Sequence, residues 1–426
     1  MRTLLPLALA ATLGCHSTKI LIDTGDSSHS HDSDSAPPDS DTHTGETGDT
    51  GDTGDTGHVV LPDITVDCMG SADYTLIQDA IDASTSGDII AVAPCTYHER
   101  LHLQGRTLEV YGTDGSANTI IDGDLGGTVL NVEDGESEGT RFAGFTLTGG
   151  LDSAGGSAIE LTSAVLDLDD IVITGCDDGY TMILSEIGFL DLTDVTIEGN
   201  DFIDGGAAIR SEAGGLTARR LVADCGEDGA YAIYEHNATL LDESTLRCAS
   251  GYGLYSHHGE LHVERSTVTG GIAGIYTEDE LDTPEERQLV SNSAVGGGSI
   301  GMDARYVHVQ VLNSVLWGTD AAFSFLGIDT ASTLTNSVFT GALCGISGDD
   351  GRLIASYNAF WANTADTCAA VAAATVSADP MFTAFPDDLT LQPGSPLINA
   401  GATGAAYLDI DGTRNDIGRW GGPGGY

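Results

Sequence analysis

The chain has 426 residues, of which 65 are acidic and 15 basic, giving a formal net charge of −50 at pH 7. Lys19 is its only lysine, so no basic track exists to neutralise phosphates; nucleic acid is excluded as a partner and an anionic lipid surface is disfavoured. The 57 glycines and the aromatic content of 6% are typical of a turn-rich all-β protein.

The first fifteen residues resemble a bacterial lipoprotein signal. Arg2 carries one positive charge, residues 4–13 form an apolar run, and Gly14 precedes Cys15, the candidate for lipidation. His16, in place of an Asp, favours the outer membrane. We expect residues 1–15 to be a signal peptide ending at the lipidated Cys15 of an outer-membrane, surface-exposed lipoprotein that contacts the membrane only through this lipid. The alternative is an ordinary secretory signal and a secreted or periplasmic protein.

Residues 16–58 are rich in Ser, Thr, Asp and Gly and end in a Gly-Asp-Thr repeat. Such a segment has too few apolar residues to form a core, and its carboxylates repel one another. We therefore expect a disordered acidic tether.

Residues 59–105 read as an N-terminal cap followed by the first strands. Ile77, Ala80 and Ile81 keep helical spacing, Gly87 stops the helix, and residues 88–93 have the composition of a strand. A short capping helix is therefore predicted.

A ten-residue phrase recurs about every 21 to 27 residues between positions 140 and 362, with alternating apolar residues that indicate strands. A second strand follows each phrase, marked by one large residue expected to point inward: Ile159, Met182, Ile209, Ile233, Leu254, Ile275, Met302, Phe325 and Ile346. Units this small must stack to share a core. Residues 106–365 are thus predicted to be the coils of an all-β, single-stranded, right-handed parallel β-helix.

Three asparagines occupy one repeat position on successive coils: Asn292, Asn313 and Asn336. We expect a structural amide ladder in which each side chain bonds to its neighbour.

The candidate site follows from register. Tyr234, Tyr255 and Tyr276 come directly after inward residues and should therefore face outward. Two residues further on, the same face carries His236, His257 and Glu278. Aromatic rings beside imidazoles and carboxylates suit sugar binding or acid–base catalysis. The alternative is cross-coil ring stacking that only stabilises the sheet.

Cysteine spacing suggests disulfides, which are common outside the cytoplasm. Two pairs are separated by about one coil, and a third would close the N-terminal segment; the pairs are Cys225 with Cys248, Cys344 with Cys368, and Cys68 with Cys95. Cys176 is left over as a buried thiol.

Residues 366–426 are expected to form a C-terminal cap over the last coil, because an exposed sheet edge invites aggregation. Asp409, Asp411 and Asp416 could hold calcium, although Gly412 comes too early for an EF-hand loop. No other cofactor is expected.

Residues 87–99 (GDIIAVAPCTYHE) and the tail with its DPMF and LTLQPGSP runs resemble pectin-lyase-like right-handed β-helix repeat proteins of the bacterial surface lipoprotein type. The resemblance covers about residues 70–426 and implies the fold rather than an activity. Lyases of this fold abstract a proton with Arg or Lys, and the folded part of this chain has no lysine.

We therefore expect a surface-anchored, non-catalytic β-helix lipoprotein, monomeric, that binds or displays at the cell envelope, with a polysaccharide or another envelope component as partner. The alternative is a carbohydrate-active enzyme, a polysaccharide hydrolase or lyase, that works at the outward Tyr/His/Glu face.

Overall fold

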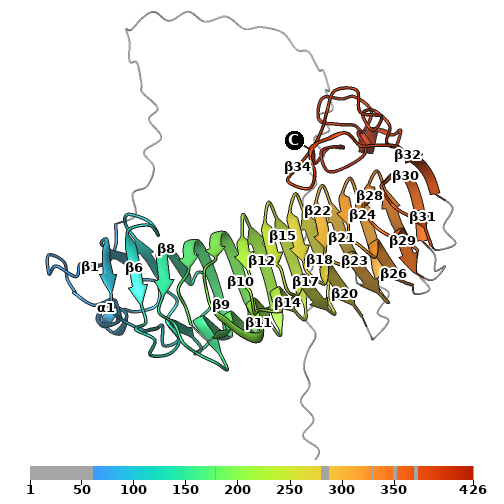
Figure 1. Ribbon diagram of the computed structural model, residues 1–426. Coiled ribbons are helices and arrows are strands. Elements are labelled where there is room, and N and C mark those ends of the chain that lie inside the picture. The colour runs from blue at the N-terminus through green and yellow to red at the C-terminus, as the bar shows by residue number, and fades with distance from the viewer. Residues whose placement is uncertain are drawn as a thin grey trace, which may run out of the picture. The chain divides into compact units, whose positions relative to one another are not determined.

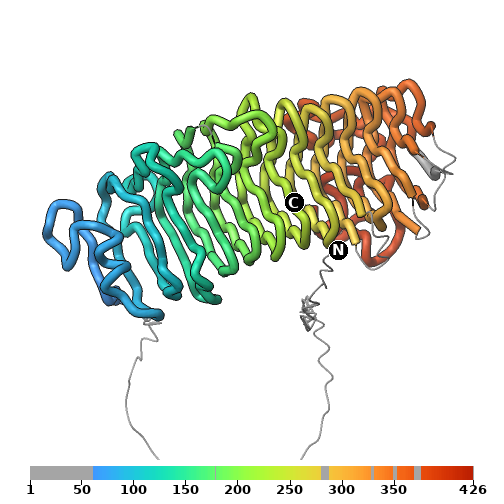
Figure 2. The backbone as a smooth tube through the Cα atoms, turned by 90° about the horizontal axis from the view of Figure 1, so that it is seen from below, coloured from blue at the N-terminus to red at the C-terminus, as the bar shows by residue number. Residues whose placement is uncertain are grey.

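The computed structural model describes residues 61–177, 179–279, 287–327, 331–348, 353–368 and 373–425. These residues belong to one compact unit, 59–426. Parallel strands stack along a single axis and form a right-handed β-helix (Figures 1 and 2). Cys15 and the predicted tether, 16–58, lie outside the described residues.

Most coils contain three short strands, each paired in parallel with its equivalent in the next coil. The first series carries the tyrosines and comprises β4 (Leu101–His102), β7 (Leu130–Val132), β11 (Phe202–Ser211), β14 (Tyr231–Glu235), β17 (Tyr252–His257), β20 (Ala273–Glu278), β23 (Ile300–Arg305), β26 (Ala321–Leu326), β29 (Cys344–Gly348) and β31 (Ala365–Thr367).

The second series starts at the N-terminal cap and comprises β1 (Ile64–Val66), β2 (Ile89–Val92), β5 (Glu109–Gly112), β12 (Gly214–Arg219), β15 (Ala238–Asp242), β18 (Leu261–Glu264), β21 (Arg287–Ser291), β24 (His308–Leu312), β27 (Ser332–Thr335) and β32 (Ala373–Ser377). The third comprises β3 (Cys95–Tyr97), β6 (Thr119–Asp122), β13 (Val222–Asp224), β16 (Thr245–Cys248), β19 (Thr267–Gly270), β22 (Ala294–Gly297), β25 (Val315–Trp317) and β28 (Val338–Thr340).

Four longer strands belong to more than one series and bend with the coil: β8 (Arg141–Thr148), β9 (Gly156–Ile173), β10 (Gly179–Ile197) and β30 (Leu353–Trp361). The pairing of β9 with β10 contains register shifts at Thr181/Ile183 and Ser185/Ile187. Such irregularities let a continuous strand turn a corner.

The core is the inside of the coil, where one apolar residue per strand stacks on its equivalent in the next coil. Ile209, Ile233, Leu254 and Ile275 are paired in this way and fully buried, as the periodicity predicted. Two expected members of the row are displaced. The residue paired with Ile159 and Ile209 is Ile183 rather than Met182, because of the first register shift in β10.

The second displacement lies in β26. Phe323, not Phe325, pairs with Met302 and Ile346. Both phenylalanines are buried, because positions two apart share one face of a strand. The sequence pattern could not choose between them.

The cross-coil ladder is built from serines, one position after the predicted asparagines. The backbone N–H of each member donates to the side-chain oxygen of the next across Ser244, Ser266, Ser293, Ser314, Ser337 and Asn358, at 2.9–3.2 Å. All six residues are buried. The expected amide ladder is therefore wrong: Asn292, Asn313 and Asn336 adopt positive φ and direct their amides elsewhere.

The predicted capping helix is α1 (Ile77–Ala83), which buries Ile77, Ala80 and Ile81. The Glu99 carboxylate accepts the backbone N–H groups of Ile77 and Gln78 at 2.9 Å each. It thereby satisfies donors that a helix start leaves unpaired. In the described part of the chain, no helix has the length and apolarity that a membrane span needs.

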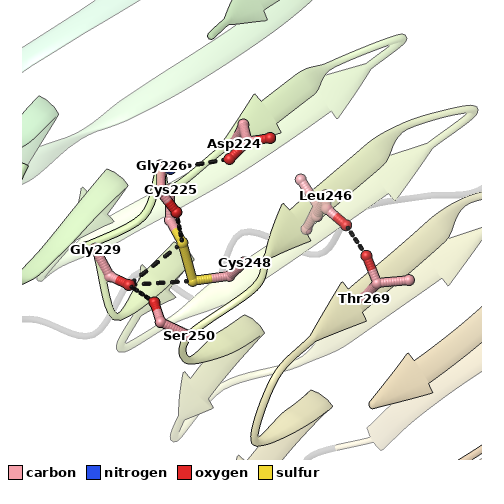
Figure 3. The surroundings of a disulfide bond; sticks show 8 residues. All are labelled: Asp224, Cys225, Gly226, Gly229, Leu246, Cys248, Ser250 and Thr269. Carbon is pink, nitrogen blue, oxygen red and sulfur yellow. Dashed lines mark hydrogen bonds between the residues drawn. A yellow bond between two sulfur atoms is a disulfide. The ribbon is translucent and has the colours of Figure 1, made fainter. Parts of the chain in front are cut away.

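Three disulfides join neighbouring coils or turns: Cys68–Cys95, Cys225–Cys248 and Cys344–Cys368. Figure 3 shows the second, in which the Gly229 carbonyl faces both sulfurs. Cys176 is free and buried, and burial raises the pKa of its thiol to about 11. It is therefore an unreactive core residue.

The predicted C-terminal cap, 366–426, includes β32, which pairs with β30 of the last predicted coil. The segment after β32 then runs back along the side of the stack (Figure 1). It contains a two-stranded hairpin, β33 (Phe382–Ala384) with β34 (Asp388–Leu391), and a 3-10 turn, η1 (Ala405–Tyr407). A row of outward apolar residues on four coils, Ala294, Val315, Val338 and Ala359, packs against its Leu389, Leu397 and Ile417.

The three asparagines that do not form a ladder instead bond to the C-terminal segment. The Asn292 amide donates to the carbonyls of Arg419 and Gly421 at 2.9 and 2.8 Å, and the Asn313 amide also donates to Gly421. The Asn336 amide oxygen accepts the backbone N–H of Ala402 at 2.8 Å. The asparagines therefore attach the closing segment to the coils.

Candidate functional site

The structure places Tyr234, Tyr255 and Tyr276 in one partly exposed row on β14, β17 and β20. Their rings are parallel and stacked, with centroids 5.1 Å apart for the first pair and 4.8 Å for the second. We call these three residues the tyrosine row. Its spacing is that of neighbouring strands, so the backbone register alone brings the rings together.

Both ends of the tyrosine row are covered by cations. The Arg210 guanidinium lies 4.3 Å from the centroid of Tyr234, and that of Arg305 lies 5.3 Å from the centroid of Tyr276. Tyr231 and Tyr252 add edge-to-face contacts along one side. The faces of the three rings are therefore occupied by one another and by guanidinium groups.

A polar rank, formed by His236, His257 and Glu278, lies beside the row on consecutive coils. The imidazoles of His236 and His257 are 5.3 Å apart, and His257 pairs with Glu278 in the sheet register. The Tyr234 hydroxyl is 2.8 Å from His236 Nε2, and Tyr276 donates to Glu278. Two members of the rank are thus hydrogen-bonded to the tyrosine row.

Glu212 extends this network. Its carboxylate lies 3.3 Å from His236 Nδ1 and also accepts Arg210. The arrangement suits a neutral imidazole that donates from Nδ1 to Glu212 and accepts the Tyr234 hydroxyl at Nε2. Burial lowers the pKa of His236, which favours this neutral form.

Burial raises the pKa of Tyr255 to about 12, with the neighbouring Tyr234 as a smaller cause. Burial also raises the pKa of Tyr234 and Tyr276, in the latter case together with the hydrogen bond to Glu278. All three phenols therefore keep their protons near neutral pH. The row thus supplies no phenolate nucleophile.

This geometry limits how a sugar could contact the tyrosine row. Because the ring faces are covered, a sugar cannot lie flat on Tyr255 between its neighbours. It would meet the ring edges and the polar rank. The sequence placed the residues on one face but carried no information about the ring planes, which depend on the stacking contacts.

The predicted calcium ligands have other roles. Asp409 accepts the backbone N–H of Asp416, Asp411 accepts the backbone N–H and hydroxyl of Thr413, and Asp416 accepts the N–H of Asn399 at 2.6 Å. These bonds hold the turns of the closing segment. Among the described residues, the three do not form a group whose ligand atoms could share one metal ion.

Within the described part of the chain, His98, Asp122 and Asp124 form the only group of three or more His, Cys, Asp or Glu residues whose ligand atoms all lie within 4.8 Å of one another. His98 Nδ1 lies 3.0 Å from Asp124 Oδ1 and 3.8 Å from Asp122 Oδ2. His98 and Asp124 are exposed, and the contacts among the three fit a surface ion pair.

Two hollows of about 430 Å³ lie away from the tyrosine row. The first surrounds Arg141, which bridges Glu109 at 2.6 Å and Asp169 at 2.5 Å. The bridging carboxylates help raise the pKa of Arg141 against the effect of its burial. An arginine held in this way keeps its proton and is a poor general base.

The second hollow was not predicted from the sequence. It lies between the coils and the closing segment, and we call it the tryptophan groove after Trp361, which is 41% exposed at one wall. Phe385, 45% exposed, contributes from the closing segment. One feature of the sequence could have indicated this hollow. Trp317 and Trp361 occupy the same repeat position two coils apart, with the smaller Thr340 between them.

No protein-family model matches the chain, and no curated protein matches it. Among solved structures, the chain is similar to the Azotobacter vinelandii mannuronan C-5 epimerase AlgE6 A-module, at 16% identity and a TM-score of 0.43, over 71% of this chain and 93% of that one. It is also similar to pectate lyase Pel9A, at 12% identity and a TM-score of 0.39, over 80% of this chain and 90% of that one.

A third similar structure is the catalytic domain of a GH87 α-1,3-glucanase, at 11% identity and a TM-score of 0.32, over 70% of this chain and 67% of that one. At these identities and TM-scores the likenesses carry no conclusion about activity. The strand pairing itself defines a parallel β-helix, which is the architecture expected from the sequence.

Proposed function

We propose that this protein is an envelope-anchored lipoprotein whose β-helix binds a polysaccharide without cleaving it. The observation that carries the proposal is the polar rank of His236, His257 and Glu278, held on consecutive coils along an outer sheet face. An extended chain laid along the coil axis would meet a hydrogen-bonding group on each of these coils. The fixed spacing pre-organises the rank for a repeating ligand.

Binding is favoured over catalysis by the state of these groups. The phenols keep their protons, and the Tyr276 hydroxyl and the Glu278 carboxylate are bonded to each other. A repeating polymer needs weak contacts on many coils rather than one reactive residue. With a net charge of −50, the chain would repel a polyuronate, so a neutral polymer is the better ligand.

A panel of immobilised polysaccharides, assayed for both bound protein and released reducing ends, tests this proposal. We expect the full chain to bind at least one neutral polymer and to release no product. Glu278→Gln should weaken binding about tenfold, because a hydrogen bond to a charged group contributes about 1.5–3 kcal/mol. His257→Ala removes a second hydrogen-bonding group of the rank and should also weaken binding. Glu227→Gln, an exposed carboxylate outside the rank, is the control. Failure to bind any polymer would reject the proposal.

The anchor has its own test. In cells, Cys15→Ala should move the protein from the membrane fraction to the soluble fraction or leave an uncleaved leader, because position 15 then has no thiol to receive the lipid. Membrane fractionation followed by immunoblotting measures both outcomes. A mutant that stays in the outer membrane with a processed N-terminus would contradict the lipoprotein assignment.

A carbohydrate-active enzyme is the second candidate because three side chains form a chain of contacts. Glu212 contacts one nitrogen of the His236 ring, and the Tyr234 hydroxyl is hydrogen-bonded to the other. A carboxylate that orients an imidazole, which in turn contacts a hydroxyl, is an arrangement used for proton transfer. The reducing-end assay separates the candidates. Product release that Tyr234→Phe abolishes would establish this second function.

A further inference from the structure

We infer that the tryptophan groove is a binding site for a neutral sugar residue, with the ring of Trp361 as its platform. The site rests on the proposed polysaccharide binding but uses other residues, all at least 62 positions further along the chain than Glu278. It joins the third strand series, at Thr340 and Trp361, to the β33–β34 hairpin of the closing segment.

The hollow exists because of an alternation in residue size. Positions 296, 317, 340 and 361 are paired in the sheet register as Gly, Trp, Thr and Trp. The Trp317 ring leans over Gly296, where an added Cβ would lie 2.0 Å from the ring. It therefore leans away from Thr340, and two coil spacings, about 10 Å, separate it from Trp361. Thr340, the small residue between them, lies at the bottom of the hollow and is only 3% exposed.

The closing segment supplies the other wall and keeps it in place. Phe385 packs edge-to-face on Trp317, with centroids 5.6 Å apart, and stacks on Phe382 at 5.9 Å. The Gln392 side chain donates to the Phe382 carbonyl at 3.0 Å, which ties the two strands of the hairpin together. The groove is thus formed by packed aromatic rings rather than by a loose loop.

The lining chemistry fits a sugar. Trp361 and Phe385 expose large apolar surfaces, against which the C–H face of a pyranose can pack. Asp379 and Gln392 are exposed at the rim and can accept hydrogen bonds from hydroxyls. Few polar groups placed around an apolar wall, in a volume of about 430 Å³, are typical of a small-ligand site.

Charge selects the kind of sugar. The residues that line the groove include the carboxylate of Asp379 and no Arg, Lys or His. An anionic uronic acid would meet this carboxylate in a strongly acidic protein, with no cation to compensate for the repulsion. A neutral hexose meets no such cost. We therefore assign the groove to a neutral glycan, either a chain end or an internal residue.

The experiment measures binding of dextran and laminarin, two neutral glucans, to the purified full chain, with polygalacturonate as the anionic counterpart. Tryptophan fluorescence and an affinity measurement are read in parallel. We expect at least one neutral glucan to change the fluorescence and polygalacturonate to have no effect. Trp361→Ala and Phe385→Ala should each raise the dissociation constant about tenfold or more, as loss of an aromatic contact in a site commonly does.

Phe189→Ala removes a more exposed ring, 61% accessible on β10 and outside the groove, and should leave affinity unchanged. Thermal melting of each variant establishes that it is folded. Loss of binding in Trp361→Ala but not in Glu278→Gln would assign the glycan to the groove. Loss in Glu278→Gln alone would overturn the groove and leave the proposed function standing. Absence of binding by the wild-type chain to every polymer of the wider panel would reject both.

Discussion

Val338→Asp should detach the closing segment from the coils while leaving the coils folded. Val338 is the first residue of β28 and is fully buried against the segment that carries Leu397 and Ile417. An aspartate there would be a carboxylate without a cation, and an uncompensated buried charge costs about 3–5 kcal/mol. Because the residue points away from the coil interior, the chain can relieve this cost by releasing the segment alone.

Hydrogen exchange measured by mass spectrometry checks this prediction. Peptides from residues 389–417 should lose protection, while peptides from β14 to β20 should keep theirs. Thr245→Asp is the matched control, because Thr245 occupies the same repeat position two coils before Ala294 and is partly exposed. Uniform loss of protection along the whole β-helix would mean that the segment and the coils unfold as one unit.

Tyr255→Ala should lower the free energy of unfolding by about 2 kcal/mol without weakening polysaccharide binding. Tyr255 stacks on Tyr234 and Tyr276 and meets Tyr231 and Tyr252 edge-on. Removing a large buried ring costs about 3–5 kcal/mol, and Tyr255 is only partly buried, so a smaller loss is expected.

Urea unfolding followed by circular dichroism measures the stability, and the polysaccharide panel measures the affinity. Tyr407→Ala, which removes an exposed ring from η1, should change neither. The opposite result for Tyr255→Ala, weaker binding at unchanged stability, would show that a sugar does reach the ring faces.

The β-helix was predictable because its signal is repeated many times. Each coil repeats the same alternation, so Ile209, Ile233, Leu254 and Ile275 could be placed inside the coil from spacing alone. The same spacing brings Cys225 next to Cys248 and Cys344 next to Cys368, the pairs that the structure joins. Errors arose where two residues fit equally well, as with Phe323 and Phe325, or where a strand is irregular, as at Met182.

The remaining features depend on contacts between distant parts of the chain. Nothing local in Asn292, Asn313 or Asn336 indicates that their amides bond to residues about 66 to 129 positions further along. The tryptophan groove has the same origin, since Trp361 and Phe385 meet only after the closing segment folds back. Sequence periodicity predicts which residues are neighbours in the stack of coils. It gives no information on where a segment outside the stack will pack.

The serine ladder has a consequence for how this chain can vary. Successive ladder residues are 22, 27, 21, 23 and 21 positions apart, yet each makes the same hydrogen bond to the next coil. The ladder therefore keeps these six coils in the same rotational phase, and differences in their length must be accommodated at the other corners. Loops at those corners could be lengthened or exchanged with no change in the direction of the axis. A scaffold of this kind can gain new surface features one coil at a time.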